Sequence, residues 1–246
     1  MKSYSWLNLG NRIFEFERLK SNRQWRFVYA NQRLFTLLLG KKRFLRSIVM
    51  LHWYLKRLCW EGIQEIIGNY ENISVMGATK DFLDEEVSPG VSVVDLGCST
   101  GHWSRYAKSL GAEVFGVDHN ESSIEIAKLL DPSIHFEAST IENFFLKNSR
   151  FYDLAILTHI LEHLDSPEQL LAILRTRTNK LIVEVPDIES DPLNFARLTL
   201  GLPFYTDSDH VREYSSQTLE QLLRSQKYKI VKTVKRGGTI AVIAKS

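Results

Sequence analysis

The feature that most constrains the fold is a short apolar segment that leads directly into a glycine-containing loop. Residues 91–96 are apolar except at two positions and follow a glycine, which is typical of a buried strand in a parallel sheet. The loop contains Gly97 and Gly101, and residues 102–110 have the pattern of a helix. A strand, a tight glycine loop and a helix in this order predict an open α/β sheet.

The same alternation of strand and helix continues to the end of the chain. We predict further strands at residues 113–118, 134–136, 152–157 and 181–185, and helices at residues 120–130, 166–175 and 216–225. Asn120 can cap the first of these helices, and Ser166 to Gln169 has the sequence of a capping box, with Pro167 at the first helical position. Two final strands, at residues 229–234 and 239–244, flank Gly237 and Gly238, a hairpin signal. The prediction is a mostly parallel sheet that ends in an antiparallel strand.

The N-terminal third differs from this part in charge and composition. Residues 1–80 carry 14 Lys and Arg against 5 Asp and Glu, whereas residues 81–246 carry 17 against 24. Apolar residues recur at helical spacing over residues 33–67, with a break at Gly40. We therefore expect a basic helical extension over residues 1–80 and a separate domain over residues 81–246. The extension either packs on that domain as a cap or attracts an anionic substrate, RNA or a membrane.

Composition excludes several classes of protein. With 44% hydrophobic residues and no low-complexity tract, the chain is not predicted to be disordered. No apolar stretch approaches the roughly 20 residues of a membrane span, and the N-terminus lacks the pattern of a signal peptide. Cys59 and Cys98 are too few for a disulfide scaffold or a cysteine-based zinc site. We expect a cytoplasmic globular protein, and its oligomeric state stays open.

The glycine loop and a nearby acid predict a nucleoside site. Asp118 ends the second strand about 20 residues after the loop, where a carboxylate can accept hydrogen bonds from both hydroxyls of a ribose. The spacing of Gly97 and Gly101 does not fit the dinucleotide pattern of G-x-G-x-x-G. Asp95, at the strand end, would repel a pyrophosphate but suits an α-ammonium or a sulfonium group. A positively charged nucleoside therefore fits better than NAD.

These segments resemble the first motifs of class I S-adenosylmethionine-dependent methyltransferases. The resemblance rests on VVDLGCSTGHWS and VFGVDHN and extends over about residues 90–246. It implies a Rossmann-like, seven-stranded sheet and S-adenosylmethionine as cofactor. In this family the acid and glycines of the first motif line the methionine part, the acid that ends the second strand holds the ribose, and the next residue flanks the adenine. The implied cofactor-binding residues are Asp95, Gly97, Cys98, Ser99, Gly101, Asp118, His119, Thr140 and Thr158, with Thr140 standing where the family commonly has an acid.

A His-x-x-Glu-His segment follows the fourth strand. His159 and His163 are four residues apart and would share a helical face, with Glu162 beside both. One imidazole could act as a general base whose tautomer Glu162 fixes. Alternatively, the histidines only pack, or they join the distant His210 in a site for a divalent metal. The segment is similar to the Glu-x-x-Glu-His element of small-RNA 3′-terminal 2′-O-methyltransferases, and it also resembles ubiquinone-pathway O-methyltransferases; His159 replaces the first glutamate of that element.

Together these features predict methyl transfer from S-adenosylmethionine to a small-molecule acceptor, at oxygen and with a histidine as base. The catalytic candidates are His159, Glu162, His163 and His210. Residues 187–214, which follow the fifth strand, and the basic extension are expected to form the acceptor pocket. Two alternatives stay open: an RNA methyltransferase that uses the basic extension, and a non-catalytic partner protein that binds S-adenosylmethionine.

Overall fold

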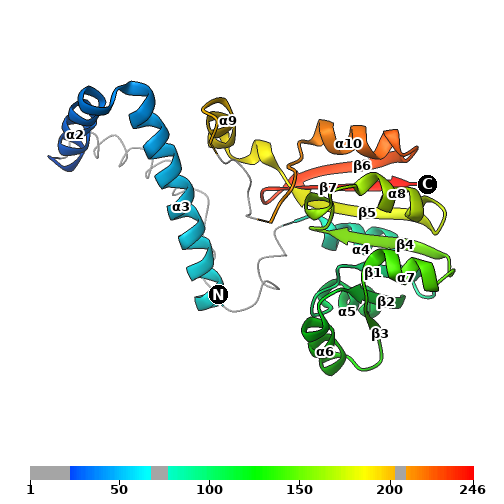
Figure 1. Ribbon diagram of the computed structural model, residues 1–246. Helices are drawn as coiled ribbons and strands as arrows, with labels where there is room; N and C mark the ends of the chain where they lie inside the picture. Colours follow the sequence, from blue (N-terminus) through cyan, green and yellow to red (C-terminus); the bar gives the residue numbers. More distant parts are fainter. Residues whose placement is uncertain (1–22, 68–76, 203–208) are drawn as a thin grey trace, which may run out of the picture.

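A seven-stranded sheet forms the centre of the protein. The computed structural model describes residues 23–67, 77–202 and 209–246 (Figure 1). The strands lie in the order β3-β2-β1-β4-β5-β7-β6. Their bounds are Ser92–Leu96 for β1, Glu113–Asp118 for β2, His135–Ala138 for β3, Tyr152–Thr158 for β4, Thr178–Pro186 for β5, Lys229–Arg236 for β6 and Thr239–Lys245 for β7. Strands β1 to β5 pair in parallel, and β7 is antiparallel to both β5 and β6, which confirms the predicted Rossmann-like class.

Helices cover both faces of the sheet. Side chains of α4 (Thr79–Glu86), α5 (His102–Ser109) and α6 (Glu121–Leu130) share one buried cluster with Val93 of β1. Those of α7 (Ile141–Lys147), α8 (Pro167–Arg175) and α10 (Ser216–Ser225) share a second cluster with Val94. Successive residues of a strand point to opposite faces. The apolar run of β1 is therefore buried from both sides, as in other parallel sheets.

The predicted elements agree with most of these bounds, and the differences have local causes. The two-residue hairpin forms at Gly237 and Gly238, whose φ angles of 63° and 87° are typical of glycine. Asn120 accepts the backbone N–H of Ser123 and caps α6, as predicted. The capping box predicted at Ser166 is wrong, because this side chain makes no capping hydrogen bond. The box forms instead at the start of α10, between Ser215 and Thr218.

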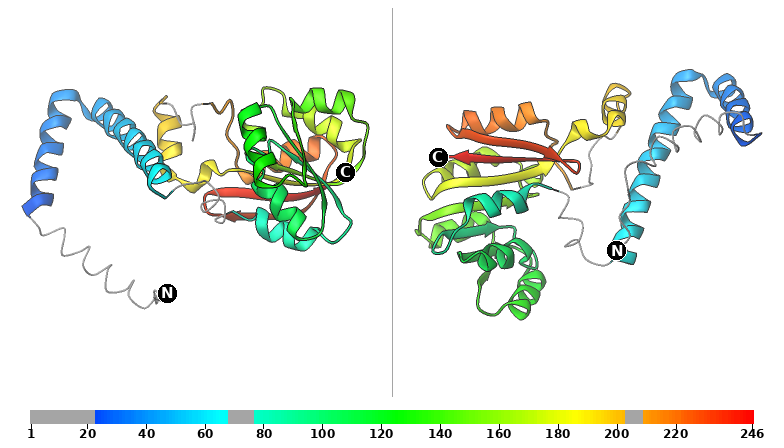
Figure 2. Two further views of the ribbon diagram at one scale, coloured as in Figure 1. Left: turned by 90° about the horizontal axis from the view of Figure 1, so that it is seen from below. Right: turned by 180° about the vertical axis from the view of Figure 1, so that it is seen from behind.

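Residues 23–67 form two helices that break at Gly40, as predicted. Helix α2 spans Arg23–Leu39 and α3 spans Lys41–Ile67, and both extend away from the sheet (Figures 1 and 2). Helix α3 packs on α9 (Pro192–Thr199), which belongs to the insertion after β5 and follows the short turn η5 (Ile188–Ser190). Lys56 Nζ of α3 lies 2.9 Å from Asp191 Oδ2, and Val49 of the same helix is buried.

Some predictions fall on residues outside the described ranges. They concern residues 1–22 and 68–76 of the basic extension and residues 203–208 of the insertion. Within the described ranges, none of the helices combines the length and the apolar character that a membrane span requires.

Candidate active site

The loop after β1 turns at positions where the backbone favours glycine. Gly97 has a φ of 68°, and its N–H donates to the carbonyl of Val117 at 2.7 Å. Gly101, immediately before α5, has a φ of 81°, and a Cβ added there would lie 2.6 Å from the Phe136 ring. Ser99 between them also has a positive φ, of 49°, which is strained for a residue with a side chain. The loop is thus held tightly against β2 and β3, beyond the carboxyl end of β1.

Asp118 connects the end of β2 to this loop. Its Oδ2 accepts the backbone N–H of Ser99 at 2.8 Å, and its Oδ1 accepts that of Asn120 at 2.8 Å. A carboxylate has about four lone-pair sites, so each oxygen can still accept a hydroxyl hydrogen. The neighbouring His119 side chain is exposed and lies 3.6 Å from Asp118 Oδ1. This arrangement fits a ribose at Asp118 with a base beside His119.

Asp95 is a buried acid at the end of β1. Its Oδ2 accepts the hydroxyl of Ser104 at 2.6 Å. Burial raises the pKa of Asp95 to about 6, against the opposing effect of the Ser104 hydrogen bond and with a further contribution from the charge of Asp118. A nearby cation would stabilise the ionised form of this carboxylate. The site therefore has the charge that suits an ammonium or sulfonium group.

The remaining candidates for cofactor binding have different environments. Cys98 is buried, and burial raises the pKa of its thiol. Thr140 caps α7, because its Oγ1 accepts the N–H of Asn143 at 3.2 Å. Thr158 Oγ1 is buried and has no hydrogen-bond partner within the described part of the chain. A buried hydroxyl without a partner is unfavourable, so Thr158 could donate to a ligand at the end of β4.

The histidine segment does not form the helix that its spacing predicts. Only a short 3-10 turn, η4 (Leu161–His163), is present, and His159 has a φ of 56°. The prediction that His159 and His163 share a helical face is therefore wrong. Instead, His159 Nδ1 lies 3.1 Å from Glu162 Oε1. The ring of His163 meets the ring of His210 edge to face, with 4.8 Å between the ring centroids.

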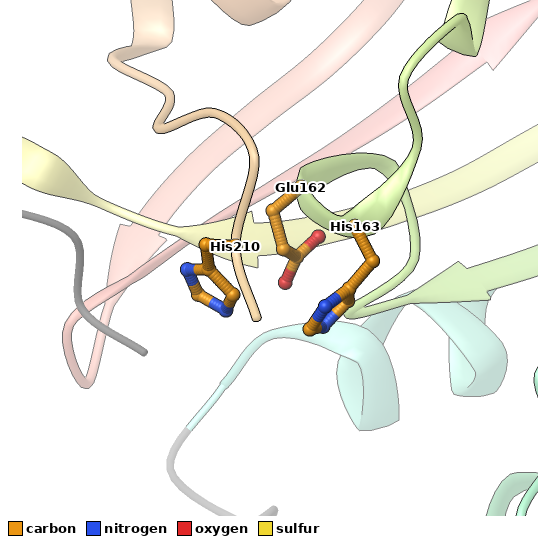
Figure 3. Close-up of side chains that lie close together, drawn as sticks. All are labelled: Glu162, His163 and His210. Atoms are coloured by element: carbon orange, nitrogen blue, oxygen red, sulfur yellow. The ribbon is translucent and has the colours of Figure 1, made fainter. Parts of the chain in front are cut away.

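Glu162 and two of the histidines form a close cluster (Figure 3). Glu162, His163 and His210 each offer one ligand atom, and these atoms lie within 4.8 Å of one another. Glu162 is fully buried, and its Oε2 has no hydrogen-bond partner among the described residues. Its carbonyl accepts the N–H of Val211 at 2.9 Å, which holds the segment of His210 against η4. Two imidazoles and a carboxylate are a donor set that could hold a divalent cation.

His159 has the features of a proton acceptor. Burial lowers its pKa, but the hydrogen bond to Glu162 and the charges of Glu162 and Glu184 outweigh this effect, so the pKa is raised overall. When Nδ1–H donates to Glu162, Nε2 is the nitrogen that can accept a proton.

His159 also lies close to the glycine loop. Leu157 of β4 pairs with Leu96 of β1, so the segments that follow them leave the sheet side by side. A Cβ on Gly97 would collide with the side chain of Ile160, the residue after His159. The two segments are therefore in contact.

Sequence reasoning missed Glu184, a buried acid in β5. Its Oε2 accepts hydrogen bonds from the N–H of Ala78 at 3.1 Å and from the N–H and hydroxyl of Thr79 at 3.0 and 2.6 Å. It thereby ties the start of α4 to the carboxyl end of β5. The signal was an acid inside the apolar run of residues 181–185, because a buried carboxylate requires partners.

Comparisons with known proteins identify the family of this chain. A family of methyltransferase domains matches residues 54–233. A ubiquinone biosynthesis O-methyltransferase of Hahella chejuensis is 31% identical over 97 residues, which cover 37% of this chain and 41% of that protein. The chain thus matches only about two fifths of the length of this relative.

Solved structures show the same fold. A SAM-dependent methyltransferase from Archaeoglobus fulgidus superposes with a TM-score of 0.57 at 19% identity, covering 76% of this chain and 99% of that one. The magnesium protoporphyrin IX methyltransferase of Synechocystis PCC 6803, solved with bound S-adenosylhomocysteine (SAH), superposes with a TM-score of 0.55 at 16% identity. The match covers 71% of this chain and 83% of that one. The chain belongs to the family of methyltransferase domains, and it has the fold of the S-adenosylmethionine-dependent enzymes.

Proposed function

We propose that the protein transfers the methyl group of S-adenosylmethionine to an oxygen of a small molecule, with His159 as the general base. The observation that carries the proposal is the pairing of His159 with the buried Glu162 directly beside the glycine loop. The family membership supports methyl transfer. The name of the Hahella chejuensis relative, an O-methyltransferase of ubiquinone biosynthesis, supports oxygen of a small molecule as the acceptor.

The residues at the carboxyl ends of β1 and β2 fit this cofactor. Asp118 would hold the ribose, His119 would flank the adenine, and the buried Asp95 would balance the positive charge of the methionine part. Gly97, Cys98, Ser99 and Gly101 would form the backbone surface that the methionine part approaches, and Thr158 would complete its polar contacts. The hydroxyl oxygen of Thr140 already accepts a hydrogen bond at the start of α7, so we propose only that Thr140 lies near the adenine. When bound, the cofactor supplies an electrophilic methyl group.

His159 would remove the proton of the acceptor hydroxyl. Nε2 of its neutral ring would accept that proton while the acceptor oxygen bonds the methyl carbon and the bond from this carbon to the sulfur of the cofactor breaks, which leaves S-adenosylhomocysteine. Glu162 would keep Nδ1–H in place and stabilise the resulting imidazolium. The strained backbone of His159 is consistent with this role, since strain concentrates at functional sites. His163 and His210 would line the acceptor side of Glu162.

A second arrangement uses the same cluster. The unpartnered Oε2 of Glu162, with His163 and His210 close by, favours a divalent cation at this position. Such a cation would polarise the acceptor oxygen. The residues would then act as its ligands, and His159 would orient Glu162.

One set of measurements tests the function and separates the two arrangements. Calorimetry with S-adenosylmethionine and S-adenosylhomocysteine tests cofactor binding, and absence of binding at millimolar concentrations contradicts the proposal. Methyl transfer is then followed with labelled cofactor on a panel of phenols, catechols and aliphatic alcohols, with amines and thiols for comparison. Activity that survives chelation supports His159 as base without a cation. Activity that chelation abolishes and a divalent cation restores supports the cation. Transfer confined to amines or thiols contradicts the assignment to oxygen.

The two parts of the chain would have different roles. We propose that residues 81–246 carry the methyl transfer and that residues 1–80 are an extension with a separate task.

A further inference from the structure

Helices α2 and α3 expose an unusual number of large apolar side chains. On α2, Leu37 is 83% exposed and Leu38 is 69% exposed. On α3, Ile48, Leu51, Leu55 and Leu58 are each about half exposed or more. Surfaces of single soluble domains rarely present apolar side chains in such continuous runs. Such a surface is typical of a site that binds a partner.

Four of the exposed apolar residues of α3 form one stripe. Ile48, Leu51, Leu55 and Leu58 are spaced by three and four residues and so lie on one side of the helix. The contact with the rest of the protein uses another side, where Val49 is buried and Lys56 pairs with Asp191. The stripe is consequently not the face with which α3 packs on α9.

The segment that carries the stripe is strongly basic. Residues 31–59 contain seven Lys and Arg and no Asp or Glu, and one of the seven, Lys56, pairs with Asp191 on the side that faces α9. Lys41, Lys42 and Arg43 are exposed at the turn between the two helices. On the helix, Lys41 and Arg43 lie on opposite flanks of the apolar stripe. Lys and Arg in such positions can keep their charges in a polar layer while their stems cover apolar surface.

We propose that α2 and α3 bind the surface of an anionic lipid membrane. An apolar stripe with basic flanks fits a bilayer interface, where leucines enter the acyl boundary and Lys and Arg meet the phosphates of anionic headgroups. The helices lie on the surface in this arrangement and do not span it.

Two other partners fit less well. A second copy of this surface would bring its exposed Lys41, Lys42 and Arg43 close to those of the first copy, and residues 31–59 contain no Asp or Glu to pair with them. RNA would satisfy the charges but not the exposed leucines, because bases stack on aromatic rings.

Vesicle sedimentation with the whole chain of residues 1–246, without cofactor, tests the proposal independently of methyl transfer. The probes are vesicles of phosphatidylcholine alone and vesicles that also contain about 30% phosphatidylglycerol. Binding to each is measured at about physiological ionic strength and at several times that ionic strength. We expect binding at least about tenfold stronger to the anionic vesicles, and weaker at high salt. Equal binding to both kinds of vesicle, or no binding, overturns the proposal.

Two sets of variants locate the surface. The triple variant K41E/K42E/R43E should remove the preference for anionic vesicles, and the double variant L51S/L55S should weaken binding to both kinds. Leu129→Ser on α6 and Lys147→Glu at the end of α7 also change exposed residues, and these variants should bind like the wild type. Circular dichroism and cofactor binding verify that each variant is folded.

Each competing partner predicts a different experimental result. If K41E/K42E/R43E and L51S/L55S bind vesicles like the wild type, the membrane-binding surface does not lie on α2 and α3. A dimer in sedimentation velocity that L51S/L55S dissociates, without vesicle binding by the wild type, assigns the stripe to a second copy. Binding of RNA without binding of vesicles assigns the basic surface to nucleic acid.

Discussion

The carboxylate of Asp118 accepts a hydrogen bond of 2.8 Å from the backbone N–H of Ser99, so the end of β2 is fastened to the loop that follows β1. Ser99 has a positive φ, and this bond is the restraint that offsets its backbone strain. The residue proposed to hold the ribose therefore also shapes the loop beside it. The proposed contact to the cofactor and the geometry of the loop thus involve the same side chain.

Replacement of Asp118 by Ala should weaken the binding of S-adenosylmethionine by about 2–3 kcal/mol, the range for lost hydrogen bonds to a charged group. Titration calorimetry measures this change. Asp118→Asn retains one acceptor oxygen and should have a smaller effect. Glu121→Ala, an exposed acid three residues away, is the matched control and should bind like the wild type. An Asp118→Ala protein with unchanged affinity would remove this residue from the site.

The buried Asp95 should make the free protein less stable than its neutral analogue. Its pKa is about 6 in the folded protein and near 3.9 when unfolded, so the folded state holds the proton more tightly. The charged form is unfavourable in the core, and stability from this group falls as the pH rises through the interval between the two values. Asp95→Asn should therefore raise the free energy of unfolding by about 1–3 kcal/mol at pH 8.

This gain should shrink as the pH approaches 4, where Asp95 of the wild type is also neutral. Urea unfolding at pH 4, 6 and 8 measures it, and the cofactor affinity of Asp95→Asn should fall because the charge partner is lost. If Asp95→Asn is less stable than the wild type at pH 8, the carboxylate of Asp95 does not destabilise the fold.

Replacement of His159 by Gln should lower kcat by about 10²–10⁴-fold, the usual contribution of a general base. Affinity for S-adenosylmethionine should stay unchanged, because His159 is not among the residues proposed to hold it. Imidazole added to the solution should restore part of the activity. His135→Gln changes an exposed histidine on β3 and is the control. A His159→Gln enzyme with full activity would exclude His159 as the base.

Glu184→Ala should destabilise the fold by about 2–4 kcal/mol, because the N–H groups of Ala78 and Thr79 would be buried without an acceptor. Urea unfolding at pH 7 gives the change. Glu184→Gln keeps one acceptor oxygen, so its loss should be smaller. Glu189→Ala, an exposed acid five residues away, should change stability by less than about 0.5 kcal/mol. Equal stability of Glu184→Ala and the wild type would contradict this role.

Much of the fold and of the cofactor loop follows from local sequence. Strands β1 and β2, the glycine loop and Asp118 lie within 27 consecutive residues, from Ser92 to Asp118, and each has a strong local signal. Burial on both faces requires near-continuous apolar strands, and the sharp turn requires glycine, so periodicity and composition were sufficient to predict them. Helices α4, α7 and α9 have shorter and more mixed patterns and were not predicted.

The histidine cluster was decided by the tertiary structure. The spacing of His159 and His163 predicted a shared helical face, but the segment after β4 forms only a 3-10 turn, since it must leave the sheet beside the glycine loop. His210 reaches His163 through backbone hydrogen bonds between residues 211–212 and Glu162, some 50 positions earlier in the chain.

The sequence by itself thus determined the sheet, the loop and the acid at the end of β2, because local chain geometry and burial leave a recognisable pattern in consecutive residues. Only the tertiary structure decided which histidine pairs with Glu162, how Glu184 holds α4, and that α3 packs on α9 while its leucines stay exposed. These contacts join residues far apart in the chain, and their energies depend on distance and burial, which spacing along the sequence does not encode.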